Sequence, residues 1–193
     1  MNRIYCAYSP CVDARAGNGV AFKFGFCESK RIRLTNMNEG WPLGDQRAPP
    51  LALCRGWTWV FSHSGPKEGE TELLDKLAAS YPVSWLISEL QAEMIDCAEK
   101  SGVPRAKDNL NGVGDIRIIG EDALIDPGRW LAEARFKTQA SISVFKQACR
   151  FSDRIRKRAG APMVNEANGG QLCSSIGVFI EAEFDRKPAF QTT

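Results

Sequence analysis

One side chain in this sequence offers an imidazole for acid–base chemistry. His63 stands between two hydroxyls in the segment Ser62-His63-Ser64-Gly65. Nucleophilic catalysis of the Ser-His or Cys-His kind would have to use it as the base. The segment follows an apolar run and enters a Gly/Pro turn, where such polar residues are common without chemistry. We therefore assign no catalytic residue, and the sequence favours a non-enzymatic protein.

The cysteines predict reduced, mostly buried thiols. They are odd in number and widely spaced: Cys6, Cys11, Cys27, Cys54, Cys97, Cys149 and Cys173. A zinc site needs four ligands, usually in close pairs, and the only short spacing here is Cys6-x₄-Cys11. Gly17-Asn18-Gly19 lacks the strand–loop–helix context of a dinucleotide-binding loop. We therefore expect no metal and no cofactor.

Short segments nevertheless resemble two enzyme families. Three of them are similar to the Arg, Ser and paired-Glu motifs of ADP-ribosyltransferases of the Arg-Ser-Glu type: Leu53-Cys54-Arg55-Gly56, Ser62-His63-Ser64 and Glu181-Ala182-Glu183. This resemblance implies an enzyme that uses Arg55, His63 and Glu181 or Glu183. The order of strands and helices is similar in outline to the ribonuclease H fold, which implies carboxylates on two metal ions. Its candidates are Asp13, Asp75 and Asp115.

The elements that would position these residues follow from hydrophobic periodicity. Alternating apolar residues predict strands at residues 3–9, 20–26, 31–34, 51–61, 115–119 and 175–184. Three- and four-residue spacing predicts helices at 70–80 and 83–100 and one long helix at 127–159. Residues 36–50 are rich in Gly and Pro and predict a long loop that carries Trp41.

This element order indicates an α+β protein. We expect a mostly antiparallel sheet of five to six strands, backed by helices on one face. A chain of 193 residues can bury a sizeable core, and no linker divides it. We therefore expect a single globular domain over residues 1–193.

Charge is strongly polarised along the chain although the formal net charge is only +2. Residues 66–101 hold three cations and eight acids, a net of −5, whereas residues 127–159 hold nine cations against Glu133 and Asp153, a net of +7. On a helical projection six of the nine cations fall within an arc of about 120°. They are Arg129, Arg135, Lys146, Arg150, Arg154 and Lys157.

Three interpretations of this stripe compete. The acidic and basic helices may simply lie side by side and neutralise each other, although surface ion pairs contribute only about 0–1 kcal/mol each. Alternatively, the stripe faces an acidic protein surface, where charge raises the association rate. The third interpretation is contact with nucleic-acid phosphates. We predict a partner-binding surface made of Arg135, Lys146, Arg150, Arg154, Lys157 and Trp41.

Composition narrows the class of protein further. Apolar residues make up 44% and charged residues 25%, which is typical of globular proteins. No apolar run approaches the ~20 residues that span a bilayer, and the first residues lack an apolar signal region. We therefore expect a cytoplasmic protein with no membrane contact. Its partner is predicted to be a protein complex, possibly a nucleoprotein.

By elimination, these features predict a regulator or inhibitor that occludes a larger nucleic-acid-handling complex. Proteins of this kind are common in viruses and mobile elements, including those that block CRISPR-type defence effectors. Direct nucleic-acid binding through the long helix is the first alternative. An ADP-ribosyltransferase-like or ribonuclease H-like enzyme is the second.

Overall fold

A computed structural model describes residues 1–17, 19–103, 111–119 and 127–159. The strands are β1 (Arg3–Tyr8), β2 (Val20–Cys27), β3 (Pro42–Leu43), β4 (Gln46–Arg47), β5 (Thr58–Ser64) and β6 (Ile116–Ile119). The α-helices are α1 (Pro10–Asp13), α2 (Lys30–Glu39), α3 (Lys67–Ser80), α4 (Ser84–Lys100), α5 (Pro127–Glu133) and α6 (Gln139–Ala159). The 3₁₀ helices within the described residues are η1 (Leu51–Leu53) and η3 (Asn111–Asp115). The α+β class is confirmed.

Four strands form an antiparallel sheet in the order β5-β1-β2-β6. β1 lies between β2 and β5, so Tyr5 is opposite Gly25 on one side and Ser62 on the other. β3 and β4 form a separate two-stranded hairpin. The expected sheet of five to six strands is therefore wrong for the described residues.

Two of the predicted strands account for this difference. Residues 31–34 lie inside α2, because Ser29 caps the helix by accepting a hydrogen bond from the backbone N–H of Ile32. The strand expected from residue 51 begins only at Thr58, since η1 and a loop precede it. The strand expected at residues 175–184 lies outside the described residues.

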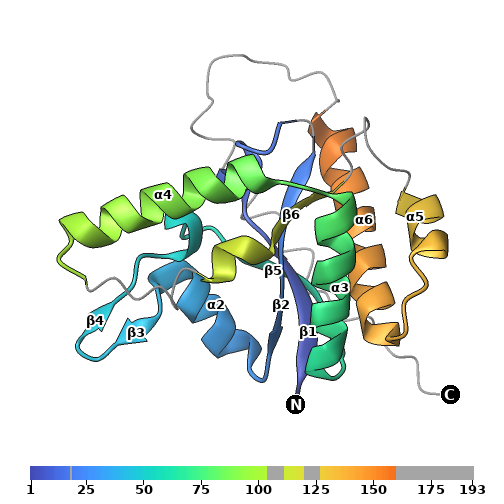
Figure 1. Cartoon of the computed structure of the whole chain (residues 1–193), viewed down its shortest axis with the longest axis horizontal. Coiled ribbons are helices and arrows are strands. Elements are labelled where there is room, and N and C mark those ends of the chain that lie inside the picture. The colour runs from blue at the N-terminus through green and yellow to red at the C-terminus, as the bar shows by residue number, and fades with distance from the viewer. Residues whose placement is uncertain (18, 104–110, 120–126, 160–193) are drawn as a thin grey trace, which may run out of the picture. The chain divides into compact units, whose positions relative to one another are not determined.

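Helices cover both faces of the sheet, and the expectation of one covered face is wrong. On one face Tyr8 packs against Phe151 of α6, with ring centroids 5.1 Å apart. On the other face Tyr5 stacks on Trp59 and approaches Met37 of α2. Figure 1 shows α2 and α4 on one side of the sheet and α3, α5 and α6 on the other. From Ile4 to Tyr8, the residues of β1 are consequently buried whichever face of the sheet they point to.

The predicted long helix at residues 127–159 is broken into α5 and α6. Arg135 adopts a left-handed backbone conformation (φ 46°) between them, which an uninterrupted α-helix cannot contain. Trp130 of α5 packs on Phe145 of α6 with ring centroids 4.4 Å apart, so α5 folds back along α6. At 1.5 Å per residue, the 21 residues of α6 extend about 32 Å instead of the expected 50 Å.

Met1–Ala161 forms one compact unit. Residues 162–193 lie outside the described part of the chain, so the expectation of a single domain over the whole chain stays a prediction. Among the described helices, none has the length and apolar character needed to cross a membrane.

Candidate functional site

The strongest candidate for a binding surface is one face of α6. Four cations recur on it at three- and four-residue steps, and all four are exposed: Lys146, Arg150, Arg154 and Lys157. We call these four residues the α6 basic stripe. They extend over about 16 Å of the helix axis, from the rise of 1.5 Å per residue. One exposed acid, Asp153, lies beside them.

The opposite face of α6 is anchored to the sheet. Its buried residues are Ala140, Ser141, Val144, Phe145, Ala148, Phe151 and Ser152. The hydroxyl of Ser152 donates to the carbonyl of Ile119 in β6 at 2.9 Å. The hydroxyl of Ser141 donates to the carbonyl of Gly69 in α3 at 2.7 Å. These bonds fix the rotation of α6 and therefore the direction in which the stripe faces.

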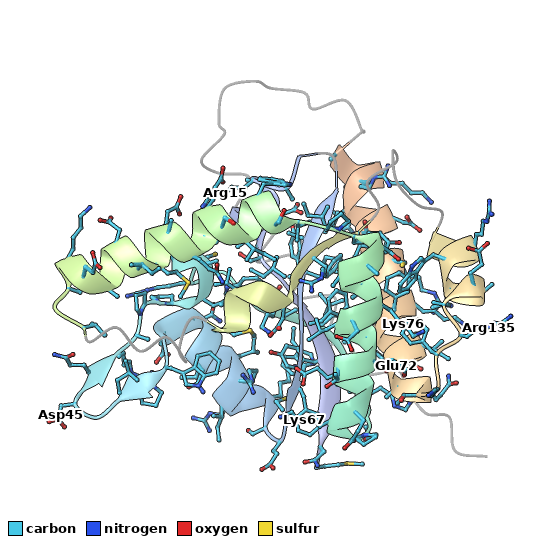
Figure 2. All side chains as sticks on the ribbon, in the orientation of Figure 1. Arg15, Asp45, Lys67, Glu72, Lys76 and Arg135 are labelled. Carbon is cyan, nitrogen blue, oxygen red and sulfur yellow. The ribbon has the colours of Figure 1, made fainter. Side chains whose placement is uncertain are left out.

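Within the described residues, no carboxylate forms an ion pair with the α6 basic stripe. The acids of α4 are engaged elsewhere, because Glu89 and Glu93 bind Arg15 at 3.0 and 2.8 Å. Figure 2 shows Arg15 beside α4, on the other side of the sheet from α6. The interpretation that the acidic helices lie beside the basic helix and neutralise it is therefore not met by α4.

The acidic helix α3 does lie against α6, but its Glu72 carboxylate binds backbone groups instead of the α6 basic stripe. Glu72 accepts hydrogen bonds from the backbone N–H groups of Lys137 and Thr138 at 2.6 and 3.1 Å. Although desolvation opposes it, this bonding lowers the pKa of Glu72. A carboxylate at this position complements the positive end of the helix dipole of α6.

Two predicted residues lie away from the stripe. Arg135 is exposed on the segment between α5 and α6, because the helix breaks there. It lines a hollow of about 470 Å³ together with Glu68, Glu72, Asp75, Lys76, Lys137 and Thr138. Figure 2 shows Glu72 and Lys76 between α3 and the segment that carries Arg135.

Trp41 is the second of these residues. It is half-buried, packs against the core and lies under the guanidinium of Arg33, 5.1 Å from the ring centroid. It belongs to the side of the sheet that α2 covers. The structure thus groups four of the six predicted contact residues and separates Arg135 and Trp41 from them.

Among the described residues, those that could support catalysis do not converge. Nδ1 of His63 lies 2.7 Å from the carbonyl oxygen of Ser64, and the hydroxyl of Ser62 accepts a hydrogen bond from Arg3. Arg55 is exposed in the loop before β5. Glu181 and Glu183 lie outside the described residues.

The acids proposed for two metal ions are also separated. Asp13 accepts hydrogen bonds from the backbone of Ala21 and from the hydroxyl of Tyr8. Asp115 is bound to Lys23, whereas Asp75 is exposed on α3. In the part of the chain that the structure describes, no group of three His, Cys, Asp or Glu side chains could hold a metal ion.

A buried lysine is the feature that sequence reasoning missed. The ammonium of Lys23 is hydrogen-bonded to Asp115 and to the carbonyl of Phe24. Burial lowers the pKa of Lys23, and the Asp115 carboxylate opposes that shift. Alternation placed Lys23 on the face of β2 that was expected to meet solvent, and α2, η1 and η3 cover that face.

Charged side chains also lie against the backbone of β2 at the end that β6 leaves unpaired. β6 pairs with β2 only from Val20 to Lys23. Beyond it, the carbonyl of Phe26 accepts from the guanidinium of Arg33 at 2.8 Å, and the Glu70 carboxyl lies near the backbone N–H of Phe26. Desolvation raises the pKa of the Glu70 carboxyl, although Lys23, the backbone of Phe26 and Arg33 act to lower it.

Comparisons of the chain with models of protein families, with curated proteins and with solved structures find no match.

Proposed function

We propose that this chain is a non-enzymatic binding protein that docks on a larger nucleic-acid-handling complex and regulates or inhibits it. The α6 basic stripe is its principal contact. The observation that carries this proposal is a row of four exposed cations on a helix whose other face is anchored, with no ion-pair partner among the described residues. Because such a row gains little for folding, an external anion explains it better.

The charge layout favours a nucleoprotein over naked nucleic acid. α4 carries the exposed acids Glu89, Glu93, Asp96 and Glu99 on the other side of the sheet, where Arg15 binds the first two and Lys100 binds Asp96. A surface with both signs of charge matches a target that displays basic protein and acidic phosphates together, and charge complementarity of this kind fixes orientation. A CRISPR-type effector with its guide RNA is one target of that chemistry.

The experiment is inhibition of target cleavage by guide-loaded CRISPR effectors, measured with the purified chain. The test variant is R150E/R154E/K157E. A matched control reverses three exposed cations outside α6, in the variant R31E/R55E/K67E, with the same change in net charge. Inhibition by the wild type and the control that is lost in the α6 variant supports the proposal. Equal inhibition by all three proteins contradicts it.

Direct nucleic-acid binding is the second candidate, favoured by the regular spacing of the stripe. Four phosphate contacts predict that log K falls with log salt with a slope of about −3 to −4 on duplex DNA. Binding of labelled DNA and RNA at two salt concentrations measures this slope. Salt-sensitive binding that the α6 variant loses would make nucleic acid itself the partner.

A further inference from the structure

Two cysteines that are far apart in sequence meet where β1 ends. Ser9 caps α1, which carries the exposed Cys11, and the loop after η1 brings the buried Cys54 to the same place. The sulfur of Cys54 lies 2.8 Å from the hydroxyl oxygen of Ser9 and accepts the backbone N–H of Gly56 at 3.3 Å.

The sulfur atoms of Cys11 and Cys54 both lie close to Gly56. A Cβ atom on Gly56 would lie 3.5 Å from the sulfur of Cys54 and 3.7 Å from the sulfur of Cys11. The two sulfur atoms are therefore at most about 7 Å apart, and a disulfide requires them to approach to about 2 Å.

The loop that carries Cys54 is strained and held at both ends. Ala52 and Leu53 both adopt φ 55°, a conformation that non-glycine residues rarely occupy. The indole N–H of Trp57 donates to the carbonyl of Leu51 at 2.9 Å, and the backbone of Trp57 is bound by Asn38. Strain of this kind persists where surrounding contacts enforce it, and it is concentrated at functional sites.

Among the other cysteines that the structure describes, Cys6 and Cys149 are disfavoured as attacking thiols. Burial raises the pKa of Cys6, and it raises the pKa of Cys149 to about 12. Thiolate formation at these two cysteines is therefore suppressed at neutral pH. None of the six cysteines that the structure describes forms a disulfide.

The geometry points to Cys11 and Cys54 as a reversible modification site that forms an intramolecular disulfide with a small-molecule disulfide as oxidant. The exposed Cys11 thiolate attacks one sulfur of glutathione disulfide and releases one glutathione as its thiolate. The thiol of Cys54 then loses its proton to solvent and attacks the Cys11 sulfur, which releases the second glutathione. The two protein thiols lose two electrons, and the oxidant is reduced to two glutathione molecules.

The test incubates the full chain, folded or in urea, with glutathione disulfide, blocks remaining thiols and digests with trypsin. Mass spectrometry detects the linked peptides 4–15 and 48–55, and fragmentation distinguishes Cys11 from Cys6. In the folded chain we expect the Cys11–Cys54 link to exceed any other pair by at least about tenfold, because folding raises the effective concentration of the pair. The half-exposed Cys97 provides the control C97S, which keeps the link.

C11S removes the link and, because Cys11 is exposed, leaves the fold in place, which circular dichroism checks. Two results would overturn the inference. One is a folded wild type that stops at a mixed disulfide of Cys11 with glutathione. The other is the same distribution of links in the folded and the urea-unfolded chain.

Discussion

The buried pair of Lys23 and Asp115 makes a sharp prediction about stability. The side chain of Lys23 is 3% exposed and that of Asp115 is 29% exposed. Replacing Asp115 by Asn leaves an ammonium in the interior without its nearest counter-charge, whereas replacing Lys23 by Met leaves a carboxylate that water can still reach. The two substitutions should therefore differ in cost.

Breaking a buried pair typically costs about 3–5 kcal/mol, and an apolar replacement is often nearly neutral. Because Glu70 is a second carboxylate near Lys23, we expect about 3 kcal/mol for D115N, at the lower end of that range. For K23M we expect about 1 kcal/mol or less, since burial already disfavours the charged form of Lys23. The double variant K23M/D115N should be about as stable as K23M.

Urea unfolding followed by tryptophan fluorescence and circular dichroism gives these free energies. In D115N the folded chain binds the Lys23 proton more weakly than the unfolded chain does. Stability of D115N should therefore rise as the pH approaches the pKa of lysine in the unfolded chain, about 10. The reasoning fails if D115N is within about 1 kcal/mol of the wild type, or if adding K23M to D115N restores no stability.

Two further predictions concern the loops. Replacing Gly40 by Ala should destabilise the chain by about 2–4 kcal/mol, because φ is 89° and the new Cβ would lie 1.7 Å from the carbonyl oxygen of Ala48. The control G44A has positive φ but open space and should cost about 1 kcal/mol in the same urea titration. The pKa of Glu72 is lower in the folded chain than in the unfolded chain. The ionised Glu72 therefore stabilises the fold fully above its unfolded pKa, and this stabilisation is lost as the pH falls through its folded pKa. The wild type should thus lose more stability than E72Q between about pH 5 and pH 3, by less than about 1 kcal/mol at this half-exposed site; identical pH profiles of the two proteins would contradict the assignment.

Periodicity predicted the elements that have strong patterns. α3, α4, β2 and β6 lie within a few residues of their expected positions. The α6 basic stripe was also readable, because a helix pattern places Lys146, Arg150, Arg154 and Lys157 on one side. These features depend on local sequence alone.

Tertiary contacts decided the rest. The break after α5 depends on the hydrogen bonds of Glu72 and on the packing of Trp130 against Phe145. Both are contacts between residues that are not neighbours in sequence, so a periodic pattern does not contain them. Because of this break, Arg135 does not lie on the α6 basic stripe. The strand expected at residues 31–34 became helical because the cap at Ser29 and the core contact of Met37 outweigh a four-residue alternation. The burial of Lys23 was missed because only one face of the sheet was expected to be covered. Helices cover both faces, so the side chain of Lys23 lies in the interior.

The charged cover on the end of β2 has a consequence for how this chain meets other molecules. An unpaired strand end offers backbone groups to which another strand can add, including one from a second copy of the chain. At Phe26 the carbonyl is already bound by Arg33, and the carboxyl of Glu70 lies near the N–H. A partner approaching there would have to displace a guanidinium and a carboxylate before any backbone bond formed. Recognition by strand addition is thus disfavoured at this edge, and side chains on helices are left to select the partner.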